Sequence, residues 1–442
     1  MAPVIRNLAG VAGSIMLSIF RISPVLPQYT LWAAVSAIRM CGIAGILVAA
    51  SLLSSSALSA PPQWDQLPVF HMEGGLKAFW NVATADRVID DAAAMAHGFS
   101  SVDLIDSYRD DRGRLTASDH SDRGSNHSNP WRMPVAMSEA IQDNLSRVGK
   151  AEILVNDIEL LFSDDPNIAY KDAGARVSSG SSSASEFADR YLEALANWYI
   201  LPCRLSRSAR PNQRIGIYGR QPIKCNYARK PWMEGELDRM RQRALWRRID
   251  PFIDFAIVGF YYFRDTPDSI YYNTAGVEEN AVSLNNASRK PLYAYAWLRL
   301  EDRTQKEVSP ALAEAAAILP YFYGASSVVL WGYEPKATTQ PYERLVDFME
   351  GLKRVAAISA ILSKAVPRDG PSAKECWWNE APLVRVFDDR DGGLLVLAAA
   401  PRLAPGESVG ITVPYQGRAV SIKVRAQHCT IARVTSGHVT EY

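Results

Sequence analysis

The chain has 442 residues, of which 48% are hydrophobic, which is enough for one domain of roughly 250–350 residues and a smaller one. Its 48 lysines and arginines nearly balance its 47 aspartates and glutamates, giving a net charge of +1. The overall charge therefore gives no reason to expect a nucleic-acid partner or an anionic membrane surface.

Residues 1–60 have the pattern of an export leader. Met40–Leu53 is an uncharged apolar run that follows several arginines, and the small residues after it suit cleavage near Ala57 or Ala60. The run is shorter than the about 20 residues of a membrane span, which predicts export without stable membrane insertion. A second apolar stretch at Ala9–Phe20 leaves open a misassigned start codon or an uncleaved anchor.

From Pro61 the chain alternates short apolar runs with helix-like segments, which is typical of parallel β/α units. Eight strands are expected over residues 61–366, which predicts a (β/α)8 TIM-like barrel with its active site at the carboxyl ends of the strands. The expected strands are Ala78–Val82, Val102–Tyr108, a short one at Val135, one that begins at Ile153, Arg214–Tyr218, Phe255–Phe263, Pro291–Leu298 and Ser326–Trp331.

The segments between these strands predict helices and two loops. Arg109–Asn129 is expected to be a long polar loop, and the Ser/Gly-rich Gly174–Ser185 a flexible one. Ser183 and Glu186 form a plausible capping box. The expected helices are Val88–Met95, Ser138–Gly149, Phe187–Trp198, Glu234–Arg248, Val277–Ser288, Pro310–Leu319 and Tyr342–Leu362.

Two acids follow the apolar run Ile153–Val155 at a spacing of two residues, Asp157 and Glu159. Strand residues two apart share one face, so the pair is expected to lie side by side at a strand end. The charge of Asp157 disfavours ionisation of Glu159, and a carboxyl group that keeps its proton can protonate a leaving oxygen in glycoside hydrolysis. The alternative is a strand end with two solvated acids.

The other strand ends carry aromatic and polar side chains toward the same face of the predicted barrel. Rings that stack on sugars and phenols that hydrogen-bond to them, placed around two acids, predict a polysaccharide-binding cleft. The expected substrate-binding residues are Asn81, Tyr108, Trp297, Trp331 and Tyr333, with Tyr218 and Tyr261 beside the catalytic acids.

Four motifs in this order resemble the hyaluronidases of animals and venoms, which are barrel glycoside hydrolases. The resemblance covers about Phe70–Leu362, and its motifs are FWNVAT at Phe79–Thr84, ILVNDIE at Ile153–Glu159, GIYG at Gly216–Gly219 and VVLWG at Val328–Gly332.

The resemblance implies a role for each matching residue. Glu159 matches the family's acid/base, and Asp157 matches the residue that orients the substrate's 2-acetamido group, whose carbonyl oxygen is the nucleophile. Tyr218, Tyr261 and Trp331 match residues that line the sugar subsite. Tyr262 is a rival for the position of Tyr261. The chain departs from the family in the apolar residues that follow Glu159, so its sugar need not be hyaluronan.

Cys203, Cys225, Cys376 and Cys429 follow the leader, an even number in an exported chain. Three pairings are possible, and Cys203–Cys225 with Cys376–Cys429 is the favoured one. The cysteines lack zinc-site spacing and the 6 histidines show no metal-binding motif, so no metal or cofactor is predicted.

Residues 367–442 have a different composition, with short strand-like runs separated by Asp-Gly, Pro-Gly and Gln-Gly turns, which predicts a small β-sandwich module. The expected strands are Leu383–Phe387, Gly393–Ala398, Glu407–Val413 and Arg418–Val424. Trp377 and Trp378 precede them, and can either bind carbohydrate or pack the module against the barrel.

The sequence therefore predicts a secreted or periplasmic glycoside hydrolase that cleaves a polysaccharide, with Glu159 as acid/base and Asp157 as its partner. A non-catalytic carbohydrate-binding or polysaccharide-assembly protein is the alternative. A glycosidase that uses another residue, such as Glu334, is a third possibility.

Overall fold

The computed structural model describes residues 64–84, 91–106, 129–131, 137–158, 162–163, 165–224, 235–302, 304–334 and 344–442. The predicted export leader and the long loop after Asp106 lie outside these residues. The chain divides into two compact units, Met1–Ser59 and Ala60–Tyr442, and the description that follows concerns the second. Among the described residues, no helix combines the length and the apolar composition that crossing a membrane requires.

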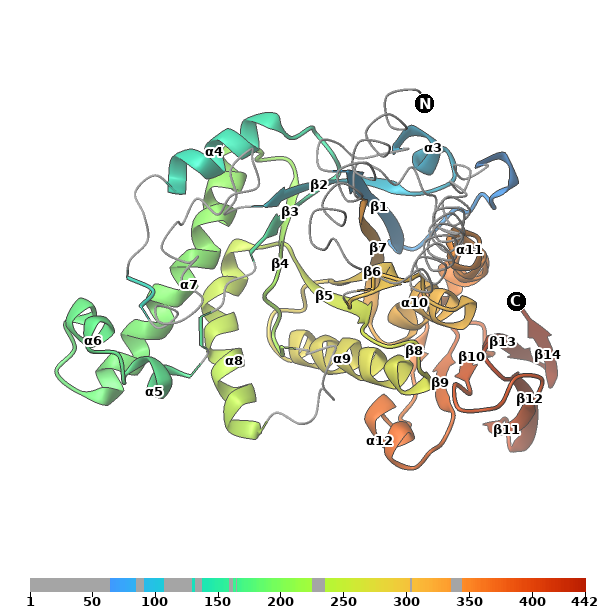
Figure 1. The fold of residues 1–442 in the computed structure, drawn as a ribbon. Helices are drawn as coiled ribbons and strands as arrows, with labels where there is room; N and C mark the ends of the chain where they lie inside the picture. Colours follow the sequence, from blue (N-terminus) through green and yellow to red (C-terminus); the bar gives the residue numbers. More distant parts are fainter. Residues whose placement is uncertain are drawn as a thin grey trace, which may run out of the picture. The chain divides into compact units, whose positions relative to one another are not determined.

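Seven parallel strands close into a barrel, because the first pairs with both the second and the last (Figure 1). The strands are β1 (Lys77–Thr84), β2 (Ser100–Asp106), β3 (Ile153–Asp157), β4 (Arg214–Tyr218), β5 (Phe255–Tyr262), β6 (Leu292–Leu300) and β7 (Ala325–Glu334).

The predicted α/β barrel is confirmed, but it closes with seven strands, and the short third strand expected at Val135 has no place in it. Strand β2 pairs directly with β3, with Val102 opposite Ile153, so no strand lies between them. Val135 itself lies outside the described residues, and helix α4 (Met137–Arg147) already begins two residues later. The direct pairing of β2 with β3 uses the ladder hydrogen bonds that a strand between them would need.

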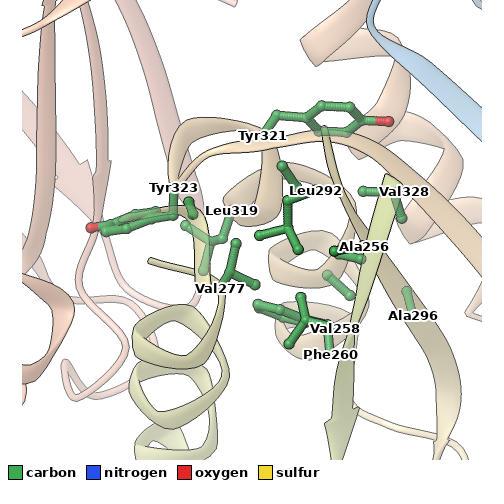
Figure 2. Close-up of a cluster of buried hydrophobic side chains, with 14 of the residues drawn as sticks. Ala256, Val258, Phe260, Val277, Leu292, Ala296, Leu319, Tyr321, Tyr323 and Val328 are labelled. Carbon is green, nitrogen blue, oxygen red and sulfur yellow. The ribbon is translucent and has the colours of Figure 1, made fainter. Parts of the chain in front are cut away.

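Alternate strand residues form two apolar layers, one inside the barrel and one facing the helices. Ile153 and Val155 point inward, whereas Leu154 between them packs on the outer side. Figure 2 shows part of the outer layer, where side chains of β5 and β6 meet Val277 and Leu319. A parallel strand is covered on both faces, which explains why these strands are recognisable as nearly continuous apolar runs.

Helices surround the barrel strands (Figure 1). Besides α4, the helices described before the C-terminal sheet are η1 (Trp64–Gln66), α3 (Asp91–Ala96), α5 (Pro166–Ala169), α6 (Ala173–Ser179), α7 (Ala184–Ala209), α8 (Glu236–Ile249), η4 (Asp250–Phe252), α9 (Pro267–Asn285), α10 (Pro310–Phe322) and α11 (Leu345–Leu362). Of these, α5 and α6 pack on α7 and not on the strands.

The predicted flexible loop at Gly174–Ser185 is wrong over its first half, which is helix α6. Asp172 caps this helix by accepting a hydrogen bond of 2.9 Å from the backbone N–H of Ala175, and Gly180 ends it with a φ of 62°. The capping contacts outweigh the low helix propensity of the Ser/Gly-rich sequence. Half of the predicted capping box is present, since the hydroxyl of Ser183 accepts from the N–H of Glu186 at 3.2 Å. The other half is not, because the carboxylate of Glu186 accepts from the N–H of Ser182, at 2.8 Å, instead of that of Ser183.

The C-terminal residues form two antiparallel layers, as predicted. A five-stranded sheet in the order β14-β13-β10-β9-β8 packs against the hairpin β11-β12. A short helix, α12 (Ala373–Trp378), carries the two tryptophans. The strands are β8 (Val366–Pro367), β9 (Leu383–Asp388), β10 (Leu394–Ala399), β11 (Ser408–Tyr415), β12 (Arg418–Arg425), β13 (Cys429–Thr435) and β14 (His438–Glu441).

The five-stranded sheet shares the hydrophobic core of the barrel. Leu395 and Leu397 of β10 join the core that surrounds the barrel strands, whereas Leu394 and Val396 between them face the hairpin. Period-two alternation thus directs one face of β10 to each neighbour.

Polar contacts also connect the C-terminal sheet to the barrel helices. Arg354 of α11 pairs with Glu314 of α10 and donates to the backbone oxygens of Cys429, at 2.5 Å, and Tyr442, at 2.7 Å. The second carboxylate oxygen of Glu314 lies 2.9 Å from Nδ1 of His428. Both members of the Arg354–Glu314 pair are largely buried, so the pair is firmly held by its surroundings.

Cys203, Cys376 and Cys429 are buried free thiols, so neither predicted disulfide is present. Cys225 lies outside the described residues. Cys203 packs within α7, where burial raises the pKa of its thiol to about 12. An even cysteine count cannot establish pairing, because a small apolar thiol is also a good core residue.

Candidate active site

Side chains from six of the barrel strands meet inside the carboxyl-terminal end of the barrel. Asp157, the last residue of β3, lies opposite Tyr218, the last residue of β4. On the other side of the barrel, Asn81 of β1 lies opposite Trp331 of β7. Parallel strands bring their carboxyl ends to one edge, so residues far apart in sequence become neighbours there.

A buried amide–phenol pair forms the polar centre of this site. The side-chain N–H of Asn81 donates to the hydroxyl of Tyr295 at 3.3 Å, and each side chain is only 1% exposed. Burial raises the pKa of the Tyr295 phenol, the Asp157 carboxylate raises it further, and the hydrogen bond from Asn81 acts in the opposite direction. Tyr295 therefore stays neutral and can donate a hydrogen bond beside the carboxylate.

An aromatic wall extends from this polar centre across β4, β5, β6 and β7. Tyr218 stands edge-on to Tyr295, with ring centroids 5.2 Å apart, and lies 6.1 Å from Tyr261. Tyr261 in turn lies 5.8 Å from Trp331, which stands edge-on to Trp297 at 5.0 Å. Edge-to-face contacts of this kind hold rings in fixed orientations.

The side chains of the site are less buried at its outer edge than in the interior of the barrel. Tyr261, Trp297 and Tyr295 are buried, whereas Asp157 and Trp331 are half-buried. The indole N–H of Trp297 is buried without a hydrogen-bond acceptor among the described residues. A ligand that enters from the open end would meet a carboxylate, hydroxyl groups and aromatic faces, which is the usual composition of a small-molecule site.

The structure brings together Asn81, Asp157, Tyr218, Tyr261, Trp297 and Trp331, six of the residues that the sequence predicts for the site. Glu159 and Tyr108 lie outside the described residues. Tyr333 and Glu334 end strand β7, but their side chains are outside the described part of the chain.

Strand alternation separates Tyr261 from its rival Tyr262. Tyr261 points into the barrel, whereas Tyr262 packs on the helix-facing side, edge-on to Phe260 at 5.6 Å. The pKa of the Tyr262 phenol is raised well above its ordinary value, because the side chain is fully buried and lies near Cys429 and Asp265. Tyr261 is therefore the tyrosine of β5 that faces the site.

Sequence reasoning missed Tyr295, although a signal for it exists. Tyr293, Tyr295 and Trp297 recur at a spacing of two in strand β6, so they share one face. All three lie in the interior cluster of the barrel. Once Trp297 is assigned to the site, the same periodicity places Tyr295 one step deeper.

No protein-family model and no curated protein matches the chain. Among solved structures, it is similar to bee venom hyaluronidase in complex with a hyaluronic acid tetramer, with 16% identity, a TM-score of 0.45, and coverage of 64% of this chain and 99% of that one. It is also similar to the endo-β-1,4-mannanase of Thermotoga petrophila, with 10% identity, a TM-score of 0.41, and coverage of 84% of this chain and 90% of that one. The endo-β-1,6-glucanase BT3312 shows 11% identity, a TM-score of 0.36, and coverage of 83% of this chain and 93% of that one.

Proposed function

We propose that this protein is a glycoside hydrolase that cleaves a polysaccharide at the carboxyl-terminal end of the barrel. The observation that carries the proposal is the half-buried Asp157 carboxylate beside the buried Asn81–Tyr295 pair, at the start of an aromatic wall. This combination offers charge stabilisation, hydrogen bonds and ring stacking to a sugar within one site.

Glu159 is the proposed acid/base. Asp157 points into the barrel, and the side chain of Ile158 points outward into the helix-facing core. The backbone N–H of Ile158 donates to the backbone oxygen of Tyr218 at 3.1 Å, which continues the pairing of β3 with β4. Strand alternation continued by one residue predicts that Glu159 shares the face of Asp157. A charge on Asp157 then favours the protonated form of Glu159, as a general acid requires.

The proposed reaction retains the configuration of the sugar. Glu159 gives its proton to the glycosidic oxygen as the bond between that oxygen and the anomeric carbon breaks. In an N-acetylhexosaminide, the acetamido oxygen forms a bond to the anomeric carbon, and Asp157 stabilises the positive charge that develops on the acetamido nitrogen. Water then attacks the anomeric carbon and loses its proton to Glu159, which restores the acid and releases the acetamido group.

The aromatic wall is proposed to hold the sugar during these steps. Trp331 and Tyr218 present half-buried rings at the open end, where a pyranose face can stack, and the buried N–H of Trp297 offers a donor to a sugar hydroxyl. The apolar run Met40–Leu53 supports export of the protein, which would bring it to extracellular or periplasmic polysaccharides.

The test is incubation of the protein with hyaluronan, chondroitin, β-mannan and bacterial β-glucans, with mass spectrometry of the products. We expect Glu159→Gln to lower turnover by about 10²–10⁴-fold, and Asp157→Asn to lower it as well, while both variants stay folded. Asp189→Asn is the matched control, because Asp189 is an exposed carboxylate on α7. Full activity of Glu159→Gln would exclude the assigned acid, and binding without cleavage would exclude hydrolysis.

A further inference from the structure

A cluster of aromatic side chains lies on the outside of the barrel, away from the residues that line the site. Trp378, the last residue of α12, is 67% exposed. Its ring stands edge-on to Trp377 at 5.5 Å, and Trp377 contacts Tyr272 of α9 at 5.8 Å. Trp377 and Tyr272 are half-buried and pack on the core, so they already serve the structural role of joining α12 to α9. That role leaves the exposed ring of Trp378 unexplained.

The backbone holds Trp378 firmly in its exposed position. Helix α12 begins with a capping box between Ser372 and Glu375. It ends with two hydrogen bonds, from the N–H of Glu380 to the oxygen of Trp377 at 3.3 Å and from the N–H of Ala381 to the oxygen of Cys376 at 2.9 Å. This is a Schellman motif, in which Glu380 takes the left-handed conformation with a φ of 53°. A helix of only six residues that is capped at both ends presents its last side chain in a defined direction.

An ion pair lies beside Trp377. The guanidinium of Arg402 donates to the carboxylate of Asp268 at 2.8 and 3.1 Å and to the backbone oxygen of Trp377 at 3.1 Å. The same guanidinium lies over the rings of Tyr271 and Trp377, 5.2 and 5.6 Å from their centroids. The exposed indole of Trp378 offers an apolar face, and the ion pair beside the neighbouring Trp377 offers polar groups. Together they match a pyranose ring, which has an apolar C–H face and a rim of hydroxyl groups.

The cluster belongs to the same end of the barrel as the proposed active site. Helix α9 follows β5 after a four-residue turn, and its first turns carry Asp268 and Tyr272. Asn273, the next residue, donates to the backbone oxygen of Tyr261 at 2.8 Å, and the side chain of Tyr261 belongs to the aromatic wall. One short stretch of backbone therefore connects the wall of the site with the surface that carries Trp378.

We propose that Trp378, with Trp377, Tyr272 and the Arg402–Asp268 pair, forms a second glycan-binding surface, here called the α12 surface. Its ligand is a segment of the polysaccharide whose cleavage site occupies the barrel, with the flat face of a pyranose stacked on Trp378. This inference rests on the proposed function for the identity of the ligand. It adds a binding site that increases the retention of long chains near the catalytic residues.

The test is affinity electrophoresis of the full chain in native gels that contain hyaluronan, chondroitin, β-mannan or β-glucan. We expect Trp378→Ala to weaken retention by roughly tenfold on the polysaccharide that retains the wild type. Trp378→Phe, which keeps an aromatic face, is expected to restore part of it. Val366→Ala is the control, because Val366 is an apolar side chain of β8 that is 61% exposed and is not part of the aromatic cluster. Thermal unfolding of each variant shows that it is folded.

The outcomes separate this inference from the proposed function. Retention that depends on Trp378, in a protein that yields no product, supports the α12 surface and overturns the hydrolase. Cleavage that depends on Glu159, with equal retention of wild type and Trp378→Ala, overturns the α12 surface and leaves the hydrolase. Absence of retention of the wild type on every polysaccharide also overturns the α12 surface, as does an equal loss in Val366→Ala.

Discussion

Replacement of Leu397 by alanine tests whether the barrel and the C-terminal sheet unfold as one unit. Leu397 lies in the middle of β10 with no exposed surface, and its side chain belongs to the core that also contains the barrel helices. The substitution leaves the β10 backbone in place and removes only the apolar groups that face the barrel.

The size of the effect follows from complete burial. Truncation of a fully buried leucine to alanine costs about 2–5 kcal/mol, through lost apolar burial and the cavity that remains. A domain is typically stable by about 5–15 kcal/mol, so this change removes a large share of the free energy of unfolding. Val439→Ala, at an exposed position on β14, is the control and is expected to change it by less than about 0.5 kcal/mol.

Two buried cysteines offer local probes for the two parts of the chain. Cys203 lies in α7 beside the barrel, and Cys429 lies in β13 of the C-terminal sheet. Burial raises the pKa of both thiols, so neither reacts with a labelling reagent until its surroundings unfold. Pulsed labelling across a urea gradient, followed by mass spectrometry of peptides, measures the midpoint at each cysteine.

We expect Leu397→Ala to lower both midpoints together. The reasoning is refuted if Cys429 becomes reactive at lower urea while the midpoint at Cys203 stays at its wild-type value. That result would mean that the C-terminal sheet is an independent domain that folds on the surface of the barrel.

Two further predictions concern the barrel interior and the α12 surface. In Gly216→Ala, the added Cβ would lie 2.2 Å from the ring of Phe255, so we expect a loss of about 3 kcal/mol in urea unfolding, and an unchanged midpoint would contradict the packing. Burial alone would raise the pKa of Asp268. Hydrogen bonds, of which the one from Arg402 has the largest effect, hold that pKa below its ordinary value. A carboxyl group whose pKa is lower in the folded state stabilises the fold at pH values above its unfolded pKa of about 4. This stabilisation is lost as the pH falls through the pKa of the folded state. Asp268→Asn should therefore be less stable than wild type near neutral pH and approach it as the pH falls through the lowered pKa of the folded state, whereas a constant difference would contradict the assignment.

The barrel strands could be predicted because burial on both faces leaves a strong pattern. Arg214–Tyr218 has the same bounds in the prediction and in β4, and Phe255–Phe263 differs from β5 by one residue. Inward and outward positions are both apolar there, so the strand signal does not depend on knowing which face is which. The sequence around Val135 has no such apolar run. The direct pairing of β2 with β3 joins residues that are far apart in the sequence, which a local pattern does not show.

Other features depend on contacts that a sequence pattern does not contain. Helix α9 begins ten residues earlier than predicted, because its first turns bury Tyr271 against the C-terminal part of the chain, where its hydroxyl donates to Ala381 at 2.9 Å. The hairpin β13–β14 was not predicted for a similar reason, since β13 is stabilised by pairing with β10. Tyr295 was overlooked because a buried tyrosine is most often a core residue.

Helix α9 gives the site and the α12 surface a fixed relation to each other. Two buried amide side chains of α9 bond to the backbone on the barrel side. Asn273 donates to the oxygen of Tyr261 at 2.8 Å. Asn280 accepts from the N–H of Ile223 at 2.9 Å and donates to the oxygen of the same residue at 3.0 Å. On its other side, Tyr272 packs on Trp377, and Glu278 accepts from the backbone N–H of Ala373 at the start of α12. Because a close-packed helix transmits displacement rather than absorbing it, a polysaccharide on the α12 surface would be held at a constant distance and angle from the aromatic wall. This rigidity distinguishes the α12 surface from a binding module on a flexible linker, which searches for substrate without determining how the chain enters the site.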